Sequence, residues 1–185
     1  MIPTIRLTAE NVTLRLMEPD DLPAIHEIYR SNVPEFLPED FDPMEEVNEE
    51  SPNYFVAESS GRLVGGAGIN LGQTGEQSLL YLACVHPDFH RKGVGSLLLL
   101  ARLAWTEGDP GVAWAVVPTR VQGFYQRFGF EPVEVPKGRQ ATPGFTRMGR
   151  WIYPGDRSEI QDALRSLPIR DLTGPEGISE EVEEE

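Results

Sequence analysis

Cysteine is nearly absent from the sequence, and long hydrophobic runs are missing altogether. Cys84 is the one cysteine among 185 residues, which excludes an internal disulfide and favours an intracellular, cytoplasmic location. No stretch approaches the roughly 18 apolar residues that a membrane-spanning helix needs. Residues 1–21 also lack the basic start and apolar run of a signal peptide. We therefore expect a globular protein with no membrane partner.

Positive charge is missing from two segments of the chain. Residues 35–50 carry eight acidic side chains and residues 171–185 carry seven, and neither segment contains a lysine or an arginine. These two segments hold half of the 30 acidic residues, so the net charge of the rest of the chain is close to zero. An acidic surface repels the phosphates of nucleic acids, and this argues against a DNA or RNA partner.

Hydrophobic periodicity predicts an α/β fold, in which a mixed β-sheet is flanked by helices on both faces. Gly65, Gly66 and Gly68 weaken the third strand or mark a bulge in it. We expect Thr119 to be the N-cap of the third helix and Gly129 to be its left-handed stop. The expected strands cover residues 12–17, 54–58, 62–69, 78–85, 112–117, 130–135 and 145–153, and the expected helices cover residues 19–30, 93–106 and 119–127.

The pattern changes after Tyr153, and we expect the domain to span residues 1–153. Residues 154–185 are then a C-terminal extension outside it. Arg157 to Leu167 can form one amphipathic helix, because Ile160, Ala163, Leu164 and Leu167 fall on one face. Residues 174–185 are acidic and lack aromatics, so we expect them to be disordered.

The most informative segment runs from Leu79 to Leu98, where an apolar strand enters a short polar loop and then an apolar helix. Gly93 and Gly95 lie at the start of that helix, where unpaired N–H groups and a partial positive charge can bind a diphosphate. The glycines do not fit a dinucleotide-binding motif, because Leu98 occupies the position of the third glycine. They also lack the Gly-Lys-Ser/Thr of a P-loop.

Two motifs in this region resemble the GNAT N-acetyltransferase superfamily. The run His90-Arg91-Lys92-Gly93-Val94-Gly95 is similar to the family's Arg/Gln-x-x-Gly-x-Gly/Ala signature, with His90 as a departure at its first position. The run Phe124 to Phe130 is similar to its aromatic-Tyr-x-x-x-Gly-Phe element. The resemblance covers residues 11–153 and implies the GNAT fold.

This resemblance implies an N-acetyltransferase that moves an acetyl group from acetyl-CoA to a primary amine of a small molecule or peptide. It implies direct transfer in a ternary complex, with no metal. Backbone groups of one strand would hold the pantetheine arm, and the following loop would hold the diphosphate. The implied cofactor-binding residues are Ala83, Cys84, Val85, Arg91, Lys92, Gly93, Val94, Gly95 and Ser96.

The resemblance also suggests catalytic residues, each with a simpler alternative. Tyr125 matches the tyrosine that protonates the leaving thiolate, although it could instead be core packing. Glu76 is a candidate general base, although a solvated turn residue is the simpler interpretation of it. Acids of residues 35–50 and a chain of waters are the alternatives. Cys84 is more consistent with packing than with a nucleophile. Pro118 stands where many relatives carry an asparagine, which puts one cofactor hydrogen bond in doubt.

Histidines and the acidic segment complete the expectations. We expect His26 to lie on the surface of the first helix, and His86 and His90 to serve surface or phosphate roles. In the family, the segment after the first helix shapes the acceptor pocket, so residues 35–50 predict a cationic acceptor unless they are only a solvated loop. An inactive acyl-CoA-binding module, an interaction protein that docks through its tail, and a homodimer remain open.

Overall fold

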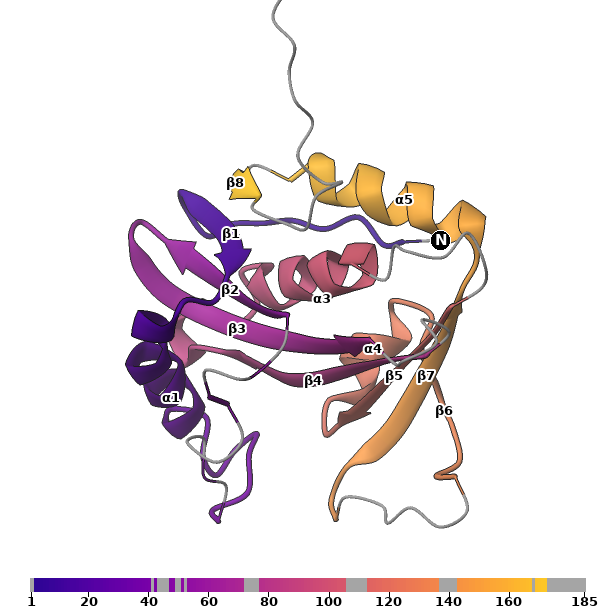
Figure 1. The fold of residues 1–185 in the computed structure, drawn as a ribbon, viewed down its shortest axis with the longest axis horizontal. Coiled ribbons are helices and arrows are strands. Elements are labelled where there is room, and N and C mark those ends of the chain that lie inside the picture. Colours follow the sequence, from indigo (N-terminus) through magenta and orange to yellow (C-terminus); the bar gives the residue numbers. More distant parts are fainter. Residues whose placement is uncertain are drawn as a thin grey trace, which may run out of the picture.

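A single mixed sheet organises the chain in the computed structural model, which describes residues 2–40, 42, 47–48, 51, 53–71, 77–105, 113–136, 143–167 and 169–172. Its eight strands within this part follow the order β6-β7-β5-β4-β3-β2-β1-β8 (Figure 1). The strands are β1 (Val12–Leu16), β2 (Tyr54–Ser59), β3 (Arg62–Leu71), β4 (Gln77–Val85), β5 (Ala113–Thr119), β6 (Glu131–Pro132), β7 (Thr146–Ile152) and β8 (Ile169–Leu172). The α-helices are α1 (Leu22–Arg30), α3 (Val94–Trp105), α4 (Gln122–Gln126) and α5 (Pro154–Arg165).

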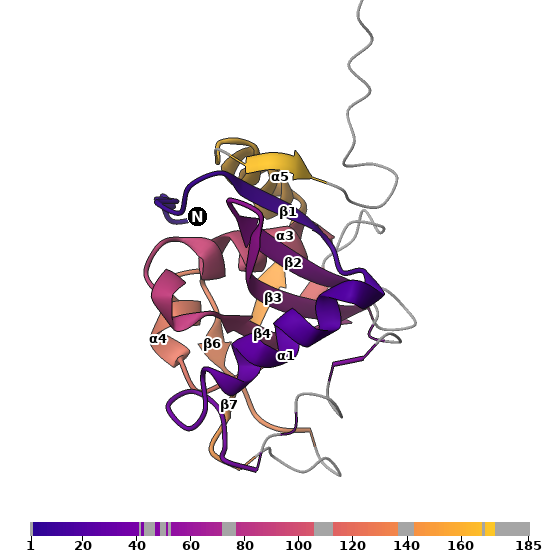
Figure 2. The ribbon, with the colours of Figure 1, turned by 90° about the vertical axis from the view of Figure 1, so that its left-hand side faces the viewer.

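Helices cover both faces of the sheet. Alternate residues of β2 enter two separate hydrophobic clusters, because side chains of a strand point to opposite faces in turn. Phe55 and Ala57 pack in the larger cluster with α3, whereas Tyr54 and Val56 pack in the smaller cluster with α1. Figure 1 shows α3 between the sheet and α5, and Figure 2 shows α1 in front of the sheet. The predicted mixed sheet with helices on both faces is confirmed.

Several predicted boundaries differ from the structure. Thr119 is the last residue of β5 and not a helix N-cap, because α4 begins only at Gln122 and Val121 is its N-cap. The sequence reasoning missed β8, which pairs in parallel with β1. Gly129 does adopt the predicted left-handed conformation, with φ of 76°. Residues 174–185, for which we predicted disorder, lie outside the described part of the chain.

His26 is buried, and this contradicts its predicted place on the surface. Its Nε2–H donates to the carbonyl oxygen of Val47 at 2.8 Å. The partner lies 21 residues further along the chain, so the local helical pattern holds no sign of it. The histidine therefore holds part of the acidic segment, residues 35–50, against α1.

The N-terminal segment, residues 2–9, runs between α3 and α5 before β1 begins (Figure 1). Ile2, Ile5 and Leu7 pack against the larger hydrophobic cluster. The backbone N–H of Thr8 donates to the carbonyl oxygen of Lys92 at 3.0 Å. This contact fixes the segment against the loop that enters α3. None of the described helices is both long and apolar enough to cross a membrane.

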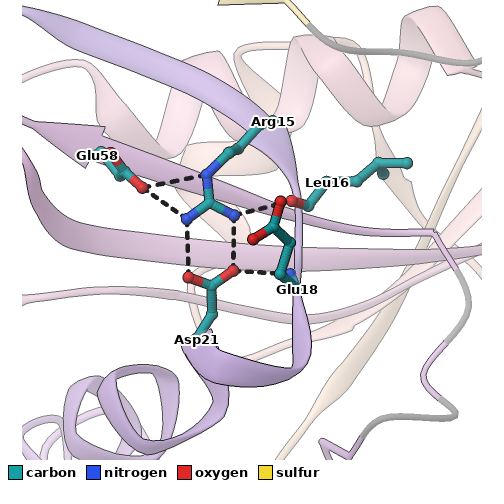
Figure 3. Close-up of polar contacts among 5 residues, drawn as sticks. All are labelled: Arg15, Leu16, Glu18, Asp21 and Glu58. Atoms are coloured by element: carbon teal, nitrogen blue, oxygen red, sulfur yellow. Dashed lines mark hydrogen bonds and ion pairs between the residues drawn. The ribbon is translucent and has the colours of Figure 1, made fainter.

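Arg15 joins β1, β2 and the entry to α1 through a network of charged hydrogen bonds (Figure 3). Its guanidinium binds both carboxylate oxygens of Asp21, at 2.6 and 2.7 Å. The same guanidinium donates to Glu58 at 2.6 Å. Burial raises the pKa of Asp21, but the hydrogen bonds from Arg15 and from the Glu18 N–H outweigh burial and hold that pKa below its ordinary value of 3.8. The network therefore stabilises the folded chain only while Asp21 is ionised.

Replacing Asp21 with asparagine is expected to lower the free energy of unfolding by about 2 kcal/mol, because the bidentate charged pair is lost. Since the folded-state pKa lies below the unfolded one, this contribution is present above about pH 4 and disappears as pH falls through the folded pKa. Urea unfolding at pH 7 and at pH 3 measures it, with the exposed Asp20→Asn as control. An equal loss at both pH values would contradict this account.

Candidate functional site

The gap between β4 and β5 is the starting point of the site. The two strands pair in parallel only over their first residues, from Gln77↔Trp114 to Leu79↔Val116. Beyond this point β4 continues to Val85 and β5 to Thr119 without pairing to each other. The facing backbone edge of Ala83 to Val85 is thus left without a strand partner in the described part of the chain. An extended ligand can add to such an edge as a further strand does.

A β-bulge in the β3–β4 pair determines where this unpaired edge of β4 lies. Gly66 of β3 pairs with Cys84, and Gly68 pairs with Tyr81, so one residue of β3 faces both Leu82 and Ala83. Leu82 adopts a left-handed conformation, with φ of 45°. A bulge bends its strand and increases the local twist, which turns the end of β4 away from β5. The predicted glycine bulge in β3 is therefore a bulge of the β3–β4 pair.

Two buried tyrosines hold the bulge from the α1 face. Tyr54 donates its hydroxyl to the carbonyl oxygen of Leu82 at 3.0 Å, and the Tyr29 hydroxyl contacts the same oxygen. Burial raises the pKa of both hydroxyls well above the ordinary value, so they remain protonated donors. Sequence reasoning missed this pair, because its partner oxygen lies 28 and 53 residues away along the chain.

Directly after Val85, at the same end of β4, a loop leads into the N-terminus of α3. Gly93 has φ of 90° and Arg91 has φ of 60°, so the backbone turns through two left-handed residues just before the helix. The first N–H groups of α3 point out of the helix and carry a partial positive charge. Glycine is required at position 93 for a steric reason in addition to its φ angle, because a Cβ there would lie 2.6 Å from the carbonyl oxygen of Arg6. This turn is built to bind an anion.

One cavity of about 650 Å³ extends from this turn along the β4–β5 gap. Its walls come from the N-terminal segment, the segment after α1, the end of β4, the start of α3, and the β5–α4 junction. Five arginines line it, and no aspartate or glutamate is found among its described lining residues. These arginines are Arg6, Arg91, Arg102, Arg120 and Arg127. The cavity therefore favours a ligand with several negative charges.

Most of the predicted cofactor-binding residues border this cavity. Ala83, Cys84, Val85, Arg91, Gly93, Gly95 and Ser96 do so. Lys92 and Val94 are not among its lining residues: the Lys92 ammonium lies 4.8 Å from the centre of the Phe89 ring, and the Val94 side chain is fully buried in the core. Glu76, the predicted general base, lies outside the described residues. No three His, Cys, Asp or Glu side chains of the described ranges gather into a metal site.

The other side chains that could take part in a reaction, Cys84, His86 and His90, have structural roles instead. Burial raises the pKa of the Cys84 thiol to about 12, which leaves it protonated at neutral pH and agrees with packing. His90 uses its Nε2–H to hold the carbonyl oxygen of Val85 at 2.8 Å, and Asn32 donates to the same oxygen at 3.0 Å. His86 accepts a hydrogen bond from the Asp88 N–H. Each of these groups braces the backbone around the end of β4.

Tyr125 lies on α4 across the gap from β4. Its ring is 3% exposed and packs edge-on against Phe124 at 4.9 Å and Phe130 at 5.5 Å between ring centres. The residue nevertheless borders the cavity. Pro118, at the position where relatives carry asparagine, also lines the cavity and offers no side-chain donor.

A splayed pair of parallel strands beside an anion-binding helix start can hold an extended ligand that carries phosphates. Comparison with known proteins agrees. Residues 50–132 match the model of the family described as acetyltransferase (GNAT) domain. These residues thus match a GNAT acetyltransferase domain, and the predicted resemblance is confirmed. No curated protein matches the sequence.

Solved structures share the fold at low sequence identity. Ard1 from Thermoplasma volcanium is 23% identical, with a TM-score of 0.60 over 77% of this chain and 98% of that one. The ribosomal-protein-S18-alanine N-acetyltransferase from Escherichia coli is 19% identical, with a TM-score of 0.56 over 77% and 94%. The paia N-acetyltransferase from Thermoplasma acidophilum, solved with coenzyme A, is 15% identical, with a TM-score of 0.60 over 75% and 98%.

Proposed function

We propose that this protein transfers an acetyl group from acetyl-CoA to a primary amine of a small molecule or peptide, by direct transfer in a ternary complex. The observation that carries the proposal is the single cavity that joins the anion-binding turn before α3 to the unpaired edge of β4. Such a cavity can take a phosphate-bearing cofactor at one end and an acceptor at the other.

The residues present fit CoA. Its two linked phosphates would meet the N–H groups between Gly93 and Ser96, with the Arg91 and Arg6 side chains nearby. A Cβ on Gly95 would come no closer than 3.9 Å to a neighbouring side chain, so the backbone there is open to a ligand. The pantetheine amides would pair with the edge of Ala83 to Val85. When bound, acetyl-CoA supplies the activated thioester.

In the proposed reaction, Tyr125 would give a proton to the leaving thiolate, and the arginines that line the cavity would help to keep the acceptor amine neutral. A tyrosine hydroxyl, with an ordinary pKa near 10, can give its proton to a departing thiolate, whose acid has a pKa of about 8.5. The acceptor must arrive as a neutral amine, and nearby arginines lower the pKa of an ammonium. Glu76 remains the proposed general base, with a chain of waters as the alternative.

A non-catalytic acyl-CoA-binding module is the second candidate. Two points favour it: Pro118 lines the cavity without a side-chain donor, where the resemblance leads us to expect an asparagine, and no carboxylate is found among the described residues that line the cavity. Such a module would bind acetyl-CoA through the same turn and edge without passing the acetyl group on.

Release of free thiol from acetyl-CoA tests the choice between these functions. The purified protein is incubated with acetyl-CoA and a panel of primary amines, amino acids and peptides, and the acetylated product is identified by mass spectrometry. We expect thiol release matched by N-acetyl product with at least one acceptor class. A higher melting temperature with acetyl-CoA, but no release with any amine, would favour the binding module. If calorimetry detects no binding of CoA thioesters, both functions are excluded.

A further inference from the structure

The arginines around the cavity fall into separate groups. Arg6 and Arg91 lie at the turn before α3, and Arg127 lies over the ring of Phe124, which faces Gly95. All three residues line the cavity that contains the proposed phosphate site. Arg102 is fully buried and donates to backbone carbonyl oxygens of Leu98 and Gly68. Arg120, at the end of β5, belongs to neither group.

The guanidinium of Arg120 lies against two neighbouring residues. Its central carbon lies 5.0 Å from the centre of the Phe145 ring, a cation–π distance. Gly144, with φ of 75°, is also close, because a Cβ there would lie 3.3 Å from Arg120 Nη2. The ring contact and the bare backbone restrict where the planar group can lie. No carboxylate in the described part of the chain pairs with Arg120.

Arg120 lies just beyond the last paired residues of β5. Thr119 and Thr146 are register partners, and Arg120 and Phe145 are the residues next to this pair. Both of them line the cavity. From the segment after α1, Phe36 and Leu37 line the same cavity. Around Arg120, the cavity combines the apolar ring of Phe145 with one cation.

We infer that the acceptor is an amine that also carries a carboxylate, and that Arg120 binds this carboxylate; the inference rests on the proposed function. A planar guanidinium matches a carboxylate with two parallel hydrogen bonds, which gives both attraction and orientation. The apolar walls raise the strength of such a pair by excluding water. With the carboxylate fixed at Arg120, the amine is directed toward the β4 edge.

This inference differs from the cationic acceptor that the acidic segment predicts. Among its described residues, the segment contributes Phe36 and Leu37 to the cavity, whereas Glu35, Glu39, Asp40 and Asp42 do not line it. A diamine or polyamine would bring its second ammonium toward Arg120, and like charges repel. An acceptor with a carboxylate avoids this cost.

Matched acceptors that differ only by carboxylate and carboxamide test the inference: glutamate, glutamine, isoglutamine and glutamine amide, with putrescine as a cationic amine. In the wild-type protein, we expect loss of one particular carboxylate to lower kcat/KM for the acceptor about tenfold or more. Arg120→Gln is expected to remove this preference and to change the KM for acetyl-CoA less than about twofold. Arg120→Glu is expected to shift the preference toward putrescine. Arg165→Gln, an exposed arginine on α5, is the control.

Three results would overturn the inference. The first is equal kcat/KM for the carboxylate and carboxamide members in the wild type, and the second is a preference for putrescine. The third is an Arg120→Gln variant that binds acetyl-CoA more weakly but keeps the acceptor preference, since Arg120 would then serve the cofactor. If acetyl-CoA binds but none of the acceptors supports thiol release, the proposed function is overturned, and the inference falls with it.

Discussion

Replacing Gly93 with alanine is expected to weaken acetyl-CoA binding by at least about 100-fold, because the turn before α3 cannot accept a side chain at this position. The added Cβ would lie 2.6 Å from the Arg6 carbonyl oxygen and 2.9 Å from the Leu7 Cα. Both atoms are backbone, so the N-terminal segment would have to move. Its hydrogen bond from Thr8 to Lys92 would break, and the N–H groups that face the phosphates would lose their orientation.

Isothermal titration with CoA and acetyl-CoA measures this loss, and an alanine control outside the site separates its causes. Gly61 lies in the β2–β3 turn with φ of 79° and open space around it. Gly61→Ala should cost about 1–2 kcal/mol of stability from its left-handed backbone and leave CoA binding intact. Equal CoA affinity in Gly93→Ala and the wild type would contradict the proposed phosphate site.

Local chemistry made the phosphate site predictable from the sequence. The turn before α3 depends on neighbours along the chain: a strand, a polar loop with Gly93 and Gly95, and an apolar helix. Gly93 has a positive φ, which only glycine adopts freely, so its residue type indicates the geometry. The same holds for the left-handed stop at Gly129. Arg91 also has a positive φ, and its residue type gave no sign of it.

Features that depend on distant pairing could not be predicted in this way. His26 faces Val47, and Tyr54 faces Leu82, so each hydrogen bond joins segments that are far apart in the sequence. Arg120 gains its orientation from Phe145, across the β5–β7 pair, and nothing in its own segment distinguishes it from a solvated arginine. A periodic pattern reports which face of an element is apolar, but not which polar atom it meets there.

Replacing Tyr125 with phenylalanine is expected to lower kcat about 100-fold and to leave the affinity for acetyl-CoA nearly unchanged. The change removes only the hydroxyl, while the ring keeps its edge-on contacts with Phe124 and Phe130. The melting temperature should therefore stay close to that of the wild type. Steady-state kinetics with the best acceptor, titration with CoA, and thermal unfolding measure the three quantities, with the exposed Tyr153→Phe as control.

The pattern of these quantities distinguishes a proton donor from a packing residue. A lower kcat with unchanged CoA affinity and melting temperature is the result expected of a proton donor at the thiolate. Joint losses of kcat, CoA affinity and melting temperature would assign Tyr125 to the core around α4. Unchanged kcat would mean that solvent protonates the thiolate, because no described carboxylate lines the cavity to take this role. The acid of the reaction would then lie outside the chain, and the protein would act chiefly by holding its two substrates together.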